Sequence, residues 1–459
     1  MNIYIHVEVA SRELDGKLLL AVLAASNNHD VLISDIGSFV KGLKSGVLKP
    51  GIFHTKSLTP GIKKINRHNI IAEKGFLISS MDEEGNLVKH GYDSFSILRY
   101  SEETVSQASF IFGWGSEDTD SLRRVYPEHS TRMYLTGSPR ADLWSPRLSA
   151  YWSAPNRSPS RPYLLVSSNL AFINGYRKLY EIIDHDMRSG YYDRDYSLFE
   201  NRFGVAEENC RLTYCFVEAI KYVSSKGNPY DIVFRPHPNE DVKAWETYLR
   251  DLPNVYVIRE GSITPWVNNS FAVLHNGCTT AIESTISGKP VITYIPFDQK
   301  FASELPNELG VCVNTAEELF CVVNDLYKSR FDYGLIDCCG ELPLSVSKKI
   351  YIDKNELAAS KIVNAWESVS TQFAFDSNVW WRYKLVLFFH SLKSVIKMIG
   401  RSFFSFLLDA PESKNKFPPL DAKDIQSRVE RLNKLLAPDS DIVCQVLSDR
   451  AVLIKKISR

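Results

Sequence analysis

The chain has 459 residues, of which 44% are hydrophobic, and its formal net charge is zero. This length gives room for two domains and an extension, and the composition excludes both a disordered chain and a protein that binds nucleic acid through bulk positive charge. The eight cysteines show no zinc-binding spacing. No apolar run reaches the roughly 18 residues of a membrane-spanning helix, so we expect a cytoplasmic protein.

Residues 1–150 are predicted to form a first α/β domain. A polar loop at 10–15 contains no GxGxxG, so the fingerprint of a dinucleotide site is absent. We expect Arg12 and Glu13 in this loop, and Arg140 in the loop that closes the domain, to face the acceptor or the cleft. The predicted elements are strands at 3–9, 30–34, 51–54, 69–72, 109–114 and 132–136, and a helix at 15–26.

A run of three carboxylates, Asp82, Glu83 and Glu84, precedes Gly85 at the end of an apolar segment that begins at Phe76. Attack by a substrate hydroxyl requires removal of its proton, and a carboxylate that faces a cleft can serve as the base. Three acidic residues in a row are also typical of a solvated turn. The residues alone leave both interpretations open.

A second α/β domain is predicted for residues 163–345, after a linker at 151–162 that is rich in Pro, Ser and Arg. Its strands are expected at 163–166, 231–234, 255–258, 271–274 and 290–295. A crossover segment at 346–375 follows, with a helix at 356–369. Two similar α/β halves joined by a hinge suggest a ligand in the cleft between them.

Two polar clusters follow strands of this second half, at the sheet edge where α/β proteins bind ligands. The first contains Arg235, His237 and Pro238. A histidine held between prolines can donate a ring N–H to a phosphate oxygen. Arg235 can bind the same group, or it can hold the loop through a carboxylate such as Glu240.

The second cluster, Asn276-Gly277-Cys278-Thr279-Thr280, opens a predicted helix at 280–287. A helix N-terminus favours anions, and two threonines after a glycine favour a phosphate site over a simple N-cap. Glu283, one turn later, can accept hydrogen bonds from a ribose or pair locally.

A metal-dependent mechanism is disfavoured. The DxD-like triplets at 118–120, 184–186, 193–195 and 439–441 follow no convincing strand. We therefore expect neither a metal nor a cofactor.

The tail, residues 376–459, differs from the rest of the chain. Between 380 and 408 apolar residues recur at steps of three and four, while Lys393, Lys397 and Arg401 fall on the opposite face and acidic residues are absent from the helix that these steps define. This pattern is typical of a helix on a membrane surface, although a helix packed on the protein itself fits it as well. A further helix at 422–436 and a strand pair at 442–454 are predicted.

The motifs VEVASRELDGKLLL, SSMDEEG, FGWGSED, TGSPRADL, RPHPNED and HNGCTTAIESTISGKPVI, in this order, resemble those of bacterial surface-carbohydrate biosynthesis proteins. That group is similar to glycosyltransferases of the GT-B fold. The resemblance implies an α/β fold of two Rossmann-like domains facing a cleft, with a helical C-terminal extension.

The pairing of EEG with HP is also similar to bacterial sialyltransferases and Kdo-transferase-like enzymes that use CMP-sugars. This similarity implies Glu83 as base, His237 on the donor phosphate, and Thr279 and Thr280 as the hydroxyl pair on that phosphate. The chain departs from that pattern by having threonines where serines are usual. It also has a third acid, so Asp82 or Glu84 could be the base instead.

The resemblance implies an inverting, metal-independent glycosyltransferase that moves a CMP-activated nonulosonic acid or Kdo onto a surface polysaccharide or lipopolysaccharide. Its partners would be the nucleotide sugar, a lipid-linked glycan acceptor and the inner face of the cytoplasmic membrane, contacted through residues 380–408. The alternatives are an enzyme similar to UDP-GlcNAc 2-epimerases, a CDP-glycerol or UDP-sugar transferase, and a non-enzymatic sugar-nucleotide-binding protein.

Overall fold

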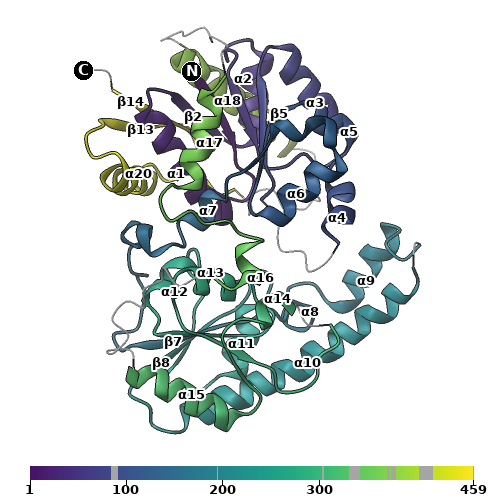
Figure 1. The fold of residues 1–459 in the computed structure, drawn as a ribbon, viewed down its shortest axis with the longest axis vertical. Helices are drawn as coiled ribbons and strands as arrows, with labels where there is room; N and C mark the ends of the chain where they lie inside the picture. Colours follow the sequence, from purple (N-terminus) through teal and green to yellow (C-terminus); the bar gives the residue numbers. More distant parts are fainter. Residues whose placement is uncertain are drawn as a thin grey trace. The chain divides into compact units, whose positions relative to one another are not determined.

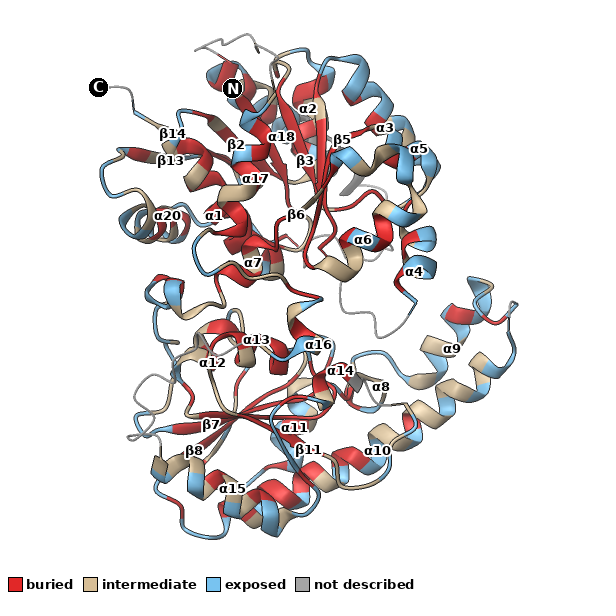
Figure 2. Ribbon diagram, viewed as in Figure 1, coloured by how far each residue is buried: buried red, intermediate tan, exposed pale blue. Residues whose placement is uncertain are grey.

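The computed structural model describes residues 1–83, 91–193, 195–301, 304–329, 342–369, 373, 379–402 and 417–457. The chain forms two compact units. Unit 1 comprises Met1–Leu143 and Pro343–Arg459, and unit 2 comprises Trp144–Leu342. Each unit has one sheet, with buried strands between helices (Figures 1 and 2). The predicted α/β class with two Rossmann-like sheets is therefore confirmed.

The sheet of unit 1 has the strand order β13-β14-β2-β1-β3-β4-β5-β6. Six of these strands are parallel, while β14 pairs antiparallel with both β13 and β2. The C-terminal hairpin thus extends the sheet that the N-terminal strand begins. The strands are β1 (Asn2–His6), β2 (Asp30–Ser34), β3 (Ile52–Thr55), β4 (Leu77–Met81), β5 (Ala108–Gly113), β6 (Met133–Leu135), β13 (Ile442–Ser448) and β14 (Ala451–Lys456).

Helices cover both faces of this sheet, and their aromatic residues pack into its core. Phe39 of α2 stacks on Phe53 of β3 with ring centroids 4.4 Å apart, and it contacts Tyr4 of β1. The helices are α1 (Ala10–Ser26), α2 (Ile36–Lys44), α3 (Ile62–Glu73), α4 (Tyr92–Arg99), α5 (Glu102–Ser106), α6 (Ser116–Val125), η1 (Pro127–Arg132), α7 (Pro139–Asp142), α16 (Leu344–Ser347), α17 (Ala358–Glu367), α18 (Val379–Ser402) and α20 (Ala422–Leu436).

The sheet of unit 2 is entirely parallel, with the order β12-β11-β10-β7-β8-β9. Its strands are β7 (Tyr163–Ser167), β8 (Asp231–Arg235), β9 (Val255–Val257), β10 (Ala272–His275), β11 (Val291–Tyr294) and β12 (Val311–Val313). Its helices are η2 (Pro146–Tyr151), α8 (Ala171–Asn174), α9 (Leu179–Arg188), α10 (Ser197–Ser224), α11 (Val242–Tyr248), α12 (Thr264–Asn269), α13 (Thr280–Ile286), α14 (Glu304–Asn307) and α15 (Ala316–Ser329).

Two sequence predictions are wrong. The polar loop expected at 10–15 is the first part of α1, which begins at Ala10 because Glu13 turns inward and its carboxylate accepts the backbone N–H of Glu8 at 2.9 Å. The strand expected at 69–72 belongs to α3, where His68 and Ile71 are buried three residues apart on one helical face.

The strand order places a topological switch point in each sheet, where consecutive connections leave in opposite directions. In unit 1 this point lies between β1 and β3, and in unit 2 it lies between β7 and β10. Open α/β sheets bind ligands beyond the carboxyl ends of the strands at such points. The residues just after these four strands are therefore the first to inspect for a site.

Candidate functional site

At the switch point of unit 2, the end of β7 is tied to the start of α13 by small polar side chains. Ser167 Oγ lies 3.2 Å from Cys278 Sγ and 3.1 Å from Thr280 Oγ1, and all three residues are buried. Thr279, by contrast, is exposed. Of the predicted hydroxyl pair, Thr280 is therefore engaged inside the unit and Thr279 faces solvent.

The loop between β10 and α13 is held by its own neighbours. Asn276 Nδ2 donates to the Tyr294 carbonyl at 2.7 Å. Gly277 has a φ of +60°, which favours glycine, and its N–H donates to Asn307 Oδ1 at 2.6 Å. Asn276 and Gly277, expected to bind phosphate, thus shape the loop in this structure.

His237 presents a hydrogen-bond donor at the end of β8. Its Nδ1 accepts the backbone N–H of Asn239 at 3.2 Å, so the proton of the neutral ring is on Nε2. Burial, and then the positive charge of Arg259, lower the pKa of His237, which keeps the ring neutral near pH 7. The half-buried ring can therefore donate Nε2–H to an oxyanion.

Two residues that the sequence did not single out in these roles fix the turn that carries His237. The buried Glu240 accepts hydrogen bonds from Ser168 Oγ at 2.7 Å, Leu170 N–H at 2.6 Å and Trp245 Nε1 at 2.6 Å. Arg259 donates to the carbonyl oxygens of Pro238, at 3.1 Å, and of Glu240, at 2.9 Å. Ser168 Oγ also accepts the His237 N–H at 3.3 Å, which joins the turn to β7.

Arg235 takes a different position from the one expected. Its guanidinium donates to the carbonyl oxygens of Glu260, at 2.8 Å, and Gly261, at 3.0 Å, and lies over the ring of Trp266. Burial lowers its pKa to about 10, although nearby negative groups, including the buried Glu283, oppose this shift. Arg235 does hold a loop, but through carbonyl oxygens rather than Glu240.

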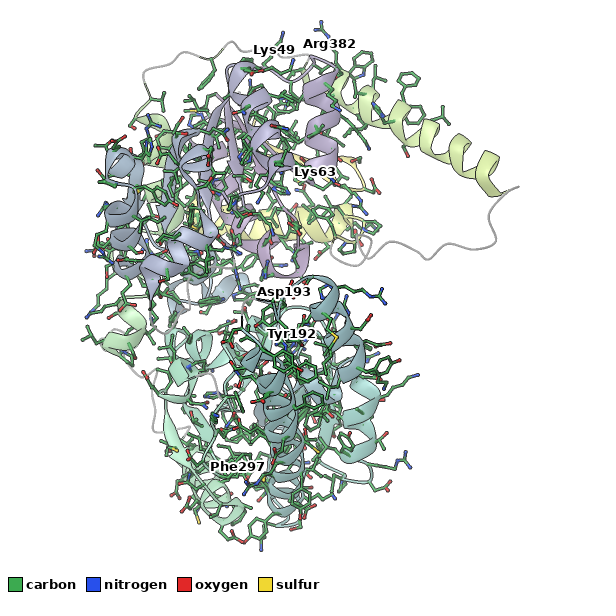
Figure 3. The ribbon with its side chains drawn as sticks, turned by 90° about the vertical axis from the view of Figure 1, so that its right-hand side faces the viewer. Lys49, Lys63, Tyr192, Asp193, Phe297 and Arg382 are labelled. Carbon is green, nitrogen blue, oxygen red and sulfur yellow. The ribbon has the colours of Figure 1, made fainter. Side chains whose placement is uncertain are left out.

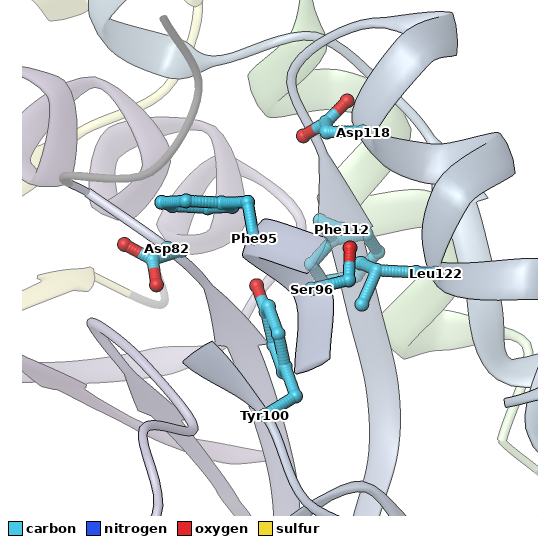
Figure 4. Close-up of a pocket in the computed structure, with 7 residues that line it drawn as sticks. All are labelled: Asp82, Phe95, Ser96, Tyr100, Phe112, Asp118 and Leu122. Atoms are coloured by element: carbon cyan, nitrogen blue, oxygen red, sulfur yellow. The ribbon is translucent and has the colours of Figure 1, made fainter. Parts of the chain in front are cut away.

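In unit 1 the carboxylates that follow β4 differ sharply in their surroundings. Asp82 is engaged by Arg99, whose Nε and Nη2 donate to its two oxygens at 2.9 and 2.7 Å. Asp82 also lines a small cavity with Tyr100 and Asp118 (Figure 4). The cavity, of about 10 Å³, has room for a single water molecule and not for a sugar.

Glu83 is buried and only half satisfied. Its Oε1 lies 2.6 Å from Lys17 Nζ, while its Oε2 has no hydrogen-bond partner in the described part of the chain. Lys17 Nζ in turn lies 3.0 Å from His54 Nε2, and His54 Nδ1 lies 3.0 Å from Ser79 Oγ. Glu84 lies outside the described residues.

The sequence missed Lys17 because it falls in the middle of an apolar helix, between Gly16 and Leu18. A lysine at such a position is itself a signal, since an unpaired charge is rarely buried. It is 2% exposed, so its carboxylate partner had to lie inside the same unit.

The other residues expected at the cleft make contacts within unit 1. Arg12 Nη2 lies 3.0 Å from Glu13 Oε1, and Arg140 lies over the ring of Trp114. Across the described ranges, no three histidine, cysteine or acidic side chains are grouped so that they could hold a metal ion.

The chain matches no protein-family model and no curated protein. Its fold is similar to that of a UDP-GlcNAc 2-epimerase from Neisseria meningitidis bound to UDP-GlcNAc, with 11% identity, coverage of 80% of this chain and 100% of that chain, and a TM-score of 0.48. The UDP-GlcNAc 2-epimerase of Methanocaldococcus jannaschii in complex with UDP-GlcNAc and UDP is 14% identical, with coverage of 80% of this chain and 100% of that chain and a TM-score of 0.46. The wall teichoic acid polymerase TagF is 11% identical, with coverage of 69% of this chain and 72% of that chain and a TM-score of 0.39. Such similarity concerns the fold and leaves the reaction open.

Proposed function

We propose that the protein is an enzyme that acts on a nucleotide-activated sugar, with Glu83 as its general base. The observation that carries this proposal is the state of the Glu83 carboxylate. It is buried, one oxygen is paired with Lys17, and the other oxygen has no partner among the described residues. A positioned carboxylate with an unpaired oxygen can take a proton from a substrate hydroxyl.

The proposed reaction is inverting, metal-independent glycosyl transfer. The acceptor hydroxyl gives its proton to Oε2 of Glu83, and its oxygen forms a bond to the anomeric carbon. The bond from that carbon to the donor phosphate breaks, and its electron pair stays on the phosphate oxygen. His237 would donate Nε2–H to this phosphate, and the exposed Thr279 offers a hydroxyl on the loop that follows β10. Following the sequence resemblance, we take the donor to be a CMP-activated keto-sugar acid and the acceptor a surface glycan.

The Lys17–Glu83 pair favours a second candidate, epimerisation of a UDP-linked sugar. The two groups, 2.6 Å apart, provide a base and an acid that could remove a proton from a carbon and return one. This reaction requires no acceptor. Incubation with UDP-GlcNAc alone, followed by NMR, would reveal the 2-epimer if epimerisation is the function.

Nucleotide binding tests the unit 2 half of the proposal. Thermal unfolding with CMP, CDP, UDP and GDP should show stabilisation by the nucleotide of the donor, about 2.7 kcal/mol at a concentration 100 times its Kd. His237→Ala should weaken that binding about tenfold or more, as expected for one lost charge-assisted hydrogen bond. His185→Ala, on the exposed side of α9, is the matched control. Equal affinities in both variants would remove His237 from the site.

The base is tested by Glu83→Gln, which keeps the shape of the side chain and removes its ability to accept a proton. The expected fall in kcat is about 10²- to 10⁴-fold, with nucleotide affinity unchanged. Glu73→Gln, at the exposed end of α3, controls for the change in charge. Wild-type turnover in Glu83→Gln would exclude Glu83 as the base.

We also propose that α18 brings unit 1 to an anionic membrane surface. Trp380, Tyr383 and Leu387 are buried in the core of unit 1, whereas Trp381, Phe388, Phe389 and Leu392 are exposed. Figure 3 shows the rest of α18 running outward from Arg382. In sequence, the helix carries Arg and Lys but no acid, which fits an anionic lipid surface. No helix in the described ranges is long and apolar enough to cross a membrane.

A further inference from the structure

The switch point of unit 1 carries a cluster of basic groups that the proposed base does not use. His6 is the last residue of β1, and Lys56 follows β3 directly. Helix α3 comes next in the chain and contributes Lys64 and Arg67, which lie on one helical face because they are three residues apart. The charges of Lys56, Lys64 and Arg67 all lower the pKa of His6, after the larger effect of burial, so the four groups lie in one region.

Three polar atoms in this region are buried without a partner. His6 is 7% exposed and its Nδ1 makes no hydrogen bond within the described part of the chain. The same holds for Nε of Arg67 and for Oγ of Ser80, at the end of β4. Buried polar groups in folded proteins are nearly always paired, and the exceptions call for an explanation. Oε2 of Glu83, also unpaired, follows the same strand.

The region also carries more positive charge than its carboxylates compensate. Lys56 is paired with Glu8 at 2.6 Å. Lys64 donates only to hydroxyl groups, those of Ser57 and Thr59, and Arg67 forms no ion pair among the described residues. Burial, followed by the charges of Lys56 and Arg67, lowers the pKa of Lys64 to about 8. Such crowding disfavours the charged forms unless an anion is present.

We infer that His6, Lys64 and Arg67 form an oxyanion-binding site for a phosphate or carboxylate group of the substrate that Glu83 deprotonates. The inference rests on the proposed function only for the role of Glu83. The guanidinium of Arg67 and the ammonium of Lys64 supply positive charge, and Nδ1 of His6 supplies a hydrogen-bond donor from the buried side. Lys17, which lies near His6, neutralises the adjacent Glu83 carboxylate, so an anion can bind beside it.

Isothermal titration of the full-length protein tests this site with two anionic probes, glycerol 3-phosphate and N-acetylneuraminate, which represent the phosphate and the carboxylate source. Glycerol and N-acetylglucosamine are the neutral controls. We expect one anionic probe to bind and the neutral compounds not to bind. Arg67→Gln and Lys64→Gln should each raise the Kd of that probe at least tenfold. Lys63→Gln, an exposed neighbour on the same helix (Figure 3), should leave it unchanged.

Thermal unfolding shows whether a variant that does not bind the probe is still folded. Without an anion, Arg67→Gln and Lys64→Gln should match or exceed the wild-type Tm, because each removes a crowded charge. The probe should raise the Tm of the wild type and not that of the variants. The inference would be overturned if neither anionic probe bound the wild type, or if Lys63→Gln weakened the binding of the probe as much as Arg67→Gln and Lys64→Gln do. Failure of the proposed function looks different, because Glu83→Gln would then keep its activity or no nucleotide would bind, while the anion still bound.

Discussion

Replacement of Glu240 by Gln is predicted to destabilise unit 2 and to loosen the turn that carries His237. Glu240 is fully buried, and its Oε1 accepts from Leu170 N–H while its Oε2 accepts from Ser168 Oγ and Trp245 Nε1. A glutamine has only one acceptor oxygen. If that oxygen replaces Oε2, the amide NH₂ faces the N–H of Leu170. Both groups are hydrogen-bond donors, so the hydrogen bond from Leu170 is lost.

The cost follows from the loss of one hydrogen bond to a charged group, about 1.5–3 kcal/mol. Burial raises the pKa of Glu240, so part of the desolvation penalty of the carboxylate is removed with the charge, and we take about 2 kcal/mol as the net effect. For a unit of this size, 1 kcal/mol shifts Tm by about 2–4 °C. The expected fall in Tm is therefore about 4–8 °C.

Two measurements check this prediction. The first is thermal unfolding followed by circular dichroism, and the second is nucleotide affinity measured by calorimetry. The nucleotide affinity should weaken several-fold, because Ser168 loses its fixed orientation and no longer accepts the hydrogen bond from the backbone N–H of His237. Glu246→Gln, exposed on α11 five residues before Asp251, removes the same charge without a buried contact. An unchanged Tm in Glu240→Gln, or an equal fall in Glu246→Gln, would refute the reasoning.

Two other predictions concern pH and lipid. Burial raises the pKa of Asp118 from 3.8 to about 6, so its contribution to stability is present below pH 3.8 and is lost as the pH rises through 6. The unfolding free energy of the wild type minus that of Asp118→Asn should fall by about 2.4 kcal/mol between pH 4 and 7 in denaturant titrations, and a constant difference would contradict this. Trp381→Ser with Phe388→Ser should reduce co-sedimentation with anionic vesicles, whereas Tyr248→Ser, an exposed aromatic of unit 2, should not. Equal binding by all three proteins would exclude the α18 surface.

Local sequence patterns predicted most strands because both faces of these sheets are covered, so each strand is a short, continuous apolar run. The segments Asp231–Arg235 and Val291–Tyr294 are examples. The same patterns failed for α3, where two adjacent isoleucines resemble a strand although only Ile71 is buried. They also could not reveal that β14 pairs with β2, since the register of Ala451 with Ser34 depends on residues more than 400 positions apart.

The candidate site was predictable in its location but not in the roles of its residues. The polar residues after β8 and β10 do lie at the carboxyl edge of the sheet, as expected for a parallel α/β unit. Which of them remain available to a ligand depends on contacts made by distant loops. Asn307 engages the Gly277 N–H, and the carbonyls of 260 and 261 engage Arg235. Such partners leave no trace in the motif itself.

The contrast between the carboxyl edges of the two sheets bears on the choice between the two candidate reactions. In unit 2 the buried cation Arg235 is bound to carbonyl oxygens, and His237 offers a neutral donor. In unit 1 the cations Lys64 and Arg67 have no carboxylate partner among the described residues. A transferase must hold two substrates, so nucleotide and anionic probe should bind together without competition. An epimerase holds one substrate, so an anion seated beside Glu83 should compete with its nucleotide sugar. Titration of the probe into protein saturated with nucleotide sugar therefore distinguishes the two reactions before any product is measured.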